Sequence, residues 1–206
     1  MTHLYLIRHA DHIYDLVDGK YPKRDQGLSP EGIKQAERLR DRLASTGEIK
    51  PDVFISSPER GAHETAQMIA PAINQPIILD KDVEEWRSED GTLSSEEFFA
   101  RWNALTKAQK PYYRWIEGCE NRMEFVLRVH LALNRILQTH EGKIILIVSH
   151  GGVIQTSFMY FFGYGEATLD RAAPEIRRTS ITHWYKSEKE ERWTLERSND
   201  CHHCDT

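Results

Sequence analysis

The sequence predicts an α/β fold, a three-layer sandwich in which helices cover both faces of a mostly parallel central sheet. Two continuous apolar runs, at 4–7 and 144–148, each end directly before a short polar turn that contains a histidine. Such runs are typical of strands that are buried on both faces of a parallel sheet. Amphipathic segments with helical spacing separate the apolar runs, and this alternation is expected of the α/β class.

The N-terminal half alternates predicted strands with predicted helices. The first helix should begin at Pro30, because Ser29 is a favourable N-cap and proline is tolerated at the first helical position. Ser57 and Pro58 repeat this pattern before the second helix. In this half we expect strands at 4–7, 53–55 and 77–79 and helices at 30–44 and 60–70.

An aromatic-rich segment at about 86–118 interrupts the alternation. We expect it to form a cap-like helical insertion with a helix at 95–105. Packing within this cap would account for most of its aromatic side chains, and an apolar wall for a ligand is the alternative. These side chains are Trp86, Phe98, Phe99, Trp102, Tyr112, Tyr113 and Trp115.

The C-terminal half returns to the alternating pattern and ends in a predicted hairpin at the sheet edge. We expect helices at 121–140 and 153–162 and strands at 144–148, 180–185 and 193–197. No internal repeat and no linker-like composition divides the chain. We therefore expect a single domain over residues 1–206 that contains the insertion at about 86–118.

Composition argues against several classes of protein. The chain has 27 Lys and Arg against 32 Asp and Glu, and a net charge of −5 is unfavourable for binding nucleic acid. The apolar runs are too short to span a bilayer, and the N-terminus lacks the pattern of a signal peptide. Cys119, Cys201 and Cys204 are an odd set, so we expect no disulfide framework and a cytoplasmic location. Cys201-His202-His203-Cys204 has the ligand types of a zinc site, although four adjacent residues rarely complete a tetrahedron.

Polar residues at three predicted strand ends favour one phosphate pocket. Arg8 and His9 follow the first strand directly, and His150 follows the strand at 144–148. Arg60 lies in the first turn of the second helix, where backbone N–H groups also favour an anion. Ligands of such sheets bind beyond the carboxyl ends of the strands, and guanidinium groups bind phosphate oxygens in pairs. The four side chains together therefore indicate phosphate chemistry.

Five short motifs extend over most of the chain in an order that suggests one enzyme family. They are Leu6-Ile7-Arg8-His9-Ala10, Gly27-Leu28-Ser29-Pro30-Glu31-Gly32, Ser56-Ser57-Pro58-Glu59-Arg60, Ser149-His150-Gly151-Gly152, and Asn199-Asp200 followed by His202. Together they resemble the motifs of the histidine phosphatase superfamily, the phosphoglycerate mutase-like proteins. Ala10 replaces the glycine of that family's Arg-His-Gly signature, a small change that still leaves room for a ligand.

This resemblance assigns roles to the residues of the pocket. It implies that His9 is the nucleophile and is phosphorylated during turnover. It also implies that Arg8, Arg60 and His150 bind the phosphate and neutralise its oxygens. Positioning and charge stabilisation of this kind dominate catalysis of phosphoryl transfer.

The proton donor is assigned by the same resemblance. Val83-Glu84-Glu85 resembles the family segment that carries the acid, and spacing favours Glu85 while Glu84 stays open. A carboxyl group there would protonate the leaving oxygen and then activate water. The expected catalytic set is His9, Glu85 and His150, with no cofactor and no metal. The expected partner is a small phosphorylated substrate, with no nucleic acid and no membrane, and homodimerisation stays open.

Hydrolysis of a phosphomonoester through a phosphohistidine on His9 is the leading function, and three alternatives stay open. A phosphoglycerate mutase-type phosphotransferase would form the same intermediate, but the short, aromatic and acidic middle segment favours hydrolysis. A non-catalytic phosphate-binding module would keep the fold without the reaction. A metallohydrolase would need Arg8 and Arg60 to lie beside a cation that they would repel. Its candidate ligands are His9, Asp11, His12, His63 and His150.

Overall fold

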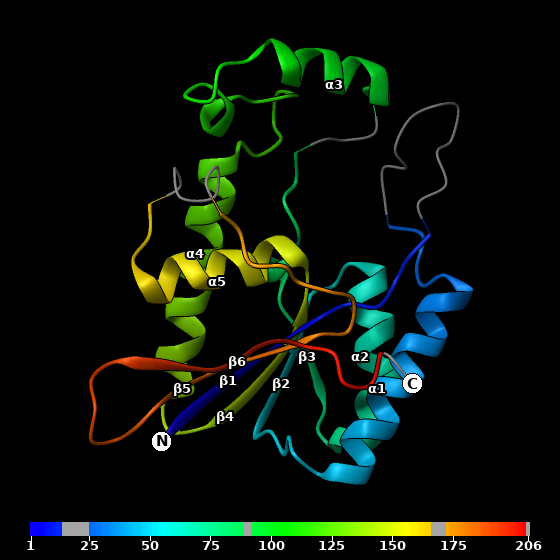
Figure 1. Cartoon of the computed structure of the whole chain (residues 1–206), viewed down its shortest axis with the longest axis vertical. Helices are drawn as coiled ribbons and strands as arrows, with labels where there is room; N and C mark the ends of the chain where they lie inside the picture. The colour runs from blue at the N-terminus through cyan, green and yellow to red at the C-terminus, as the bar shows by residue number, and fades with distance from the viewer. Residues whose placement is uncertain (14–24, 89–91, 166–171, 205–206) are drawn as a thin grey trace.

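The computed structural model describes residues 1–13, 25–88, 92–165 and 172–204, and it confirms the predicted α/β sandwich with a mostly parallel sheet (Figure 1). Within these residues, six strands form one sheet in the order β3-β2-β4-β1-β5-β6. The strands are β1 (Thr2–Arg8), β2 (Val53–Ser56), β3 (Ile77–Leu79), β4 (Ile144–Ser149), β5 (Ile181–Lys186) and β6 (Trp193–Asp200). The helices are α1 (Pro30–Thr46), α2 (Arg60–Ile73), α3 (Ser95–Ala104), α4 (Arg122–Thr139) and α5 (Gly151–Phe162), with 3-10 turns η1 (Lys81–Val83) and η2 (Lys110–Tyr112).

Strand β1 lies inside the sheet, between β4 and β5. It runs parallel to β4, which continues through parallel β2 to β3, whereas β5 and β6 form an antiparallel hairpin on its other side. Arg8 pairs with Ser149 at the ends of β1 and β4, and the backbone N–H of His9 donates to the Ser149 carbonyl at 2.8 Å. This register makes β1 and β4 end side by side, so that His9 and His150 emerge at the same edge of the sheet.

Two helical layers cover the sheet. In Figure 1, α1 and α2 lie on one side of the strands and α4 and α5 lie on the other. Leu4 and Leu6 of β1 pack into the core under α4 and α5, whereas Tyr5 and Ile7 pack into the core under α1 and α2. Burial on both faces explains why these strands are continuous apolar runs. None of the described helices has the length and apolar character needed to cross a membrane.

The helix starts depend on their capping residues. The Ser29 hydroxyl accepts a backbone N–H of the first turn of α1, and Pro30 is the first helical residue, as predicted. Helix α5 corrects the prediction, because it begins at Gly151 rather than at 153. The reason is that His150 is itself the N-cap, so the chain turns from β4 into the helix without a loop.

The segment predicted as an insertion carries α3 and η2 and lies at one end of the molecule, apart from the sheet (Figure 1). Its residues 89–91 lie outside the described residues. The ring centroids of Phe98 and Trp115 are 4.1 Å apart, and those of Trp102 and Trp115 are 5.6 Å apart. Trp115 is buried, whereas Phe99 and Tyr112 are exposed. Part of the aromatic set therefore forms a small local core, and part faces solvent.

Two leucines of α4 offer a matched test of this packing. Leu133 is fully buried, whereas Leu131 is 61% exposed. Leu133→Ala should lower the free energy of unfolding by about 2–5 kcal/mol, because it removes buried methyl groups and leaves a cavity. Leu131→Ala should change it by less than about 0.5 kcal/mol. Urea unfolding followed by circular dichroism measures both, and equal losses would contradict this orientation of α4.

Candidate active site

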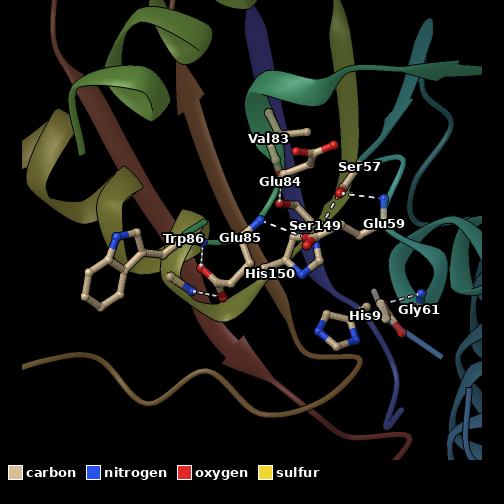
Figure 2. A network of polar contacts seen from close by, with 12 residues as sticks. His9, Ser57, Glu59, Gly61, Val83, Glu84, Glu85, Trp86, Ser149 and His150 are labelled. Atoms are coloured by element: carbon tan, nitrogen blue, oxygen red, sulfur yellow. Dashed lines mark hydrogen bonds and ion pairs between the residues drawn. The ribbon is translucent and has the colours of Figure 1, made fainter. Parts of the chain in front are cut away.

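Two histidines meet at the carboxyl ends of β1 and β4. His9 follows β1, His150 caps α5, and each residue is only 3% exposed. Their ring centroids lie 4.9 Å apart, with the ring planes inclined at 58°. Figure 2 shows the two rings next to one another at the end of the strands. The structure thus brings together the two histidines singled out in the sequence.

His9 is held as a neutral imidazole. Its Nδ1 lies 2.7 Å from the Ala10 carbonyl oxygen, so Nδ1–H donates and Nε2 keeps its lone pair. Burial lowers the pKa of His9 well below the usual 6.5, and the nearby charges of His150 and Arg178 act in the same direction. The ring of His12 stacks on His9 at a centroid distance of 4.7 Å and adds a third effect of the same sign. A neutral Nε2 is the state that a nucleophile needs.

His150 has the opposite charge state because a carboxylate contacts it. Glu59 Oε2 lies 2.7 Å from His150 Nε2, and the Ser57 hydroxyl oxygen lies 2.8 Å from the same nitrogen (Figure 2). Burial by itself would lower the pKa of His150, but the hydrogen bond and charge of Glu59 outweigh it and raise the pKa. The pKa of Glu59 falls to about 2 in spite of its burial, chiefly through its hydrogen bond to His150. The pair is therefore an imidazolium–carboxylate ion pair.

The two predicted phosphate-binding arginines differ in their placement. Arg8 packs against the first residue of α5, where a Cβ on Gly151 would lie 3.4 Å from Arg8 Cζ. Its Nη1 donates to the Ile176 carbonyl at 2.5 Å. The structure does not bring Arg60 to the histidines: its side chain is 63% exposed, and its Nε donates to Glu64 Oε1 at 2.6 Å. Arg60 thus forms an ordinary i, i+4 ion pair on the surface of α2.

Three residues that the sequence analysis did not assign to the phosphate pocket surround the histidines. Arg178 places Nη1 3.0 Å from His9 Nε2, Glu59 holds the proton of His150, and His12 stacks on His9. Glu59 lies inside a recognised motif, and its position at the start of a helix after β2 was the available signal. No motif marks Arg178, which lies just before β5.

The two candidate acids point in different directions. The Glu85 carboxylate accepts the backbone N–H groups of Trp86 and Gly152, at 3.1 and 3.0 Å, and this holds it at the first turn of α5 (Figure 2). The Glu84 carboxylate instead pairs with Arg87 at 2.7 Å. The geometry therefore favours Glu85 as the carboxyl group of the site, in agreement with the spacing in the sequence.

The metal hypotheses gain no support from the geometry. Among the described residues, no group of three or more His, Cys, Asp or Glu side chains is placed to hold a metal ion. The sulfur atoms of Cys201 and Cys204 instead lie 3.9 and 3.7 Å from the Arg178 carbonyl oxygen. Arg178 also faces His9, where its positive charge would repel a cation.

A comparison with known protein families shows which family this chain belongs to. The sequence model of the Histidine phosphatase superfamily (branch 1) matches residues 4–201. The chain belongs to this superfamily. The resemblance of its motifs is thereby confirmed, and the chain is an enzyme of the histidine phosphatase type.

Curated relatives within the superfamily include mutases and phosphatases by name. The chain is 26% identical over 214 residues to the "Probable phosphoglycerate mutase GpmB" of Proteus mirabilis, with 98% of this chain and 95% of the relative covered. It is 22% identical over 214 residues to the "Metal-independent phosphoserine phosphatase" of Arabidopsis thaliana, with 98% and 83% covered.

Solved structures of similar fold cover nearly the whole chain. Bacillus stearothermophilus YhfR superposes with a TM-score of 0.79 at 24% identity, over 98% of this chain and 99% of that one. The phosphoserine phosphatase of Entamoeba histolytica, solved with 3-phosphoglyceric acid, superposes with a TM-score of 0.74 at 24% identity, over 98% and 99%. At these identities the likeness establishes the fold.

The ion pair between Glu59 and His150 can be tested by titration. Because the pKa of His150 is raised above 6.5 in the folded protein, the pair stabilises the fold below that pH and loses its effect as pH rises through the folded pKa. Glu59→Gln should lower the pKa of His150, since burial then acts without the carboxylate. NMR titration of the histidine ring signals measures this, with Glu64→Gln as a control that alters a carboxylate bonded to Arg60 and to the Leu28 N–H rather than to His150. An unchanged His150 titration in E59Q would contradict the assignment.

Proposed function

We propose that this enzyme hydrolyses a phosphomonoester through a phosphohistidine on His9. The observation that carries the proposal is the contrast between two adjacent buried histidines. His9 Nδ1 bonds to the Ala10 carbonyl and its pKa is lowered, whereas His150 Nε2 contacts the Glu59 carboxylate and its pKa is raised. A neutral imidazole can attack phosphorus, and an adjacent imidazolium can stabilise the charge on the phosphoryl oxygens. Membership of the histidine phosphatase superfamily supports the same mechanism.

The first half of the reaction transfers the phosphoryl group to the protein. The lone pair of His9 Nε2 attacks phosphorus in line while the bond from phosphorus to the leaving oxygen breaks. Arg8 and His150 lie at the start of α5, where the helix dipole adds to their positive charge. Arg60 would join them only if its guanidinium left Glu64.

The second half returns the enzyme to its starting state. Glu85 gives its proton to the leaving oxygen in the first half and then accepts a proton from water. The activated water attacks phosphorus, the bond from phosphorus to His9 Nε2 breaks, and inorganic phosphate leaves. No metal ion and no cofactor enters this sequence of steps.

The names of the relatives guide the choice of substrate. Similar proteins are named as acting on phosphoserine, and one similar structure was solved with 3-phosphoglyceric acid. We therefore propose a small phosphorylated metabolite as substrate and phosphoserine as the first compound to assay. A phosphoglycerate mutase-type phosphotransferase is the second candidate, which the name of the Proteus mirabilis relative supports. Release of inorganic phosphate rather than an isomeric phosphate ester would distinguish hydrolysis from transfer.

Trapping the intermediate tests the nucleophile. Quenching with alkaline detergent during turnover of a ³²P-labelled phosphomonoester should leave a label on the wild-type protein that is stable to base and lost in acid, with EDTA present throughout. His9→Ala should abolish the label because it removes the attacking nitrogen. His140→Ala, which changes the residue after α4, serves as the control and should keep it. A label that persists in H9A, or a wild-type enzyme that turns over without any label, would contradict the proposal.

Comparison of two adjacent glutamates tests the acid. Glu85→Gln should lower kcat for phosphoserine by about 10²–10⁴-fold, because general acid–base catalysis contributes about that much. Glu84→Gln should have a much smaller effect, since its carboxylate pairs with Arg87. With p-nitrophenyl phosphate, whose leaving group departs without a proton, E85Q should instead accumulate phosphoenzyme. Equal losses in E84Q and E85Q would refute this assignment.

A further inference from the structure

A guanidinium outside the predicted site faces the nucleophile. Arg178 lies between α5 and β5, and its Nη1 is 3.0 Å from His9 Nε2. Its Nε lies 3.7 Å from Asp11 Oδ1, and the other oxygen of Asp11 accepts the Ser29 hydroxyl at 2.7 Å. Asp11 thus links the guanidinium to the start of α1. The Arg178 side chain is mostly buried, with 19% exposed.

The direction of the hydrogen bond to His9 follows from the opposite side of the ring. Since Nδ1–H donates to the Ala10 carbonyl, Nε2 has only a lone pair to offer and accepts from Arg178. The guanidinium therefore lies in front of the atom that attacks phosphorus. When that lone pair forms a bond to phosphorus, the N–H donors of Arg178 face the phosphoryl oxygens, which are stronger acceptors.

The backbone next to Arg178 is strained and firmly held. Thr179 has φ +56°, a left-handed conformation that is unfavourable for a β-branched residue, and its side chain is fully buried. Its N–H donates to the Arg8 carbonyl at 3.0 Å, its hydroxyl donates to the Arg178 carbonyl at 2.8 Å, and His203 Nε2 lies 3.0 Å from that hydroxyl. Such strain persists where the surroundings enforce it, and it is concentrated at functional sites. The contacts orient Arg178 toward His9.

The first turn of α2 places no guanidinium at this side of the site. Arg60 points to the surface, and the residue after it is Gly61. A Cβ on Gly61 would lie 2.9 Å from Asp25 Oδ2 and 3.2 Å from His12 Nδ1. At Gly61, therefore, α2 presents only backbone, which packs against Asp25 and against His12 of the loop after β1, and it supplies no guanidinium there.

We propose that Arg178 is the second phosphate-binding guanidinium of the site, beside Arg8, and that it exchanges its hydrogen bond to His9 for phosphoryl oxygens when substrate binds. This proposal rests on the proposed function, in which His9 is the nucleophile. It makes Arg178 a catalytic residue, because it touches the reacting nitrogen before the reaction and the transferred group during it.

Binding of inorganic phosphate tests the proposal without turnover. Isothermal titration calorimetry should show phosphate bound at least about tenfold more weakly by Arg178→Gln than by wild type, because a charge-assisted hydrogen bond is lost. Arg178→Lys keeps the charge without the planar fork and should fall between the two. Arg177→Gln removes the adjacent, exposed arginine and should bind phosphate as wild type does. R60Q should weaken binding less than R178Q.

The pH dependence of kcat/KM distinguishes a catalytic role of Arg178 from a merely structural one. His9 is faced by Arg178 from the segment before β5, by His150 from α5 and by His12 from the loop after β1. Arg178 is one of the positive charges that lower the pKa of His9. Its removal should therefore shift the acid limb of kcat/KM to higher pH in R178Q, while R177Q keeps the wild-type profile.

The outcomes separate this proposal from the proposed function. Wild-type phosphate affinity with an unmoved acid limb in R178Q would overturn the role of Arg178, even if His9 is labelled as expected. Weakened phosphate binding in R178Q without any label on wild-type His9 would overturn the phosphohistidine route and retain Arg178 as a phosphate ligand only. Circular dichroism checks folding, and if R178Q does not fold, wild-type affinity in R178K overturns the proposal.

Discussion

The parallel pairing of β1 with β4 is the interaction on which the site depends. It joins two strands that are far apart in the sequence and makes them end together, with Arg8 opposite Ser149. A slip of one residue would draw Arg8 into the sheet between two apolar cores, where an unpaired charge is costly. Because that cost opposes a change of register, the two histidines leave the sheet at adjacent positions, and the helix that starts at Gly151 directs its N-terminus toward them.

Neighbouring charges then give two identical side chains different roles. The groups around His9 are cations and a carbonyl, which keep its ring neutral and its Nδ1 protonated. Burial lowers the pKa of His150, but the carboxylate of Glu59 at hydrogen-bond distance, with the charges of Glu85 and Asp25, outweighs burial and raises it. Since the rings are close, a proton on His150 also disfavours a proton on His9. Glu59 therefore contributes to the nucleophilicity of His9 without touching it.

The sequence was sufficient for the fold class and for the placement of the two histidines at strand ends, because each depends on a local pattern or on the ends of buried strands. The choice of Glu85 over Glu84 as the acid stays a prediction. The direction of Arg60 could not be predicted, since it depends on the rotation of α2 about its own axis and on the competing partner Glu64. Arg178 could not be predicted either, because its contact with His9 spans most of the chain and depends on how the segment before β5 is held. Local motifs identify the histidines that follow the strand ends. Long-range packing determines which guanidinium contacts them.

The end of β6 and the turn after it help to position Arg178. Arg42 of α1 pairs with Asp200 at 2.6 Å, and this holds the end of β6 against the helix. From there the chain turns so that His203 contacts Thr179, the strained residue next to Arg178. The α1 region therefore supports Arg178 in two ways: its N-cap Ser29 bonds to Asp11, and Arg42 farther along the helix holds the C-terminal turn. Two independent attachments to one helix can hold a guanidinium 3.0 Å from His9 Nε2 in spite of an unfavourable backbone conformation beside it.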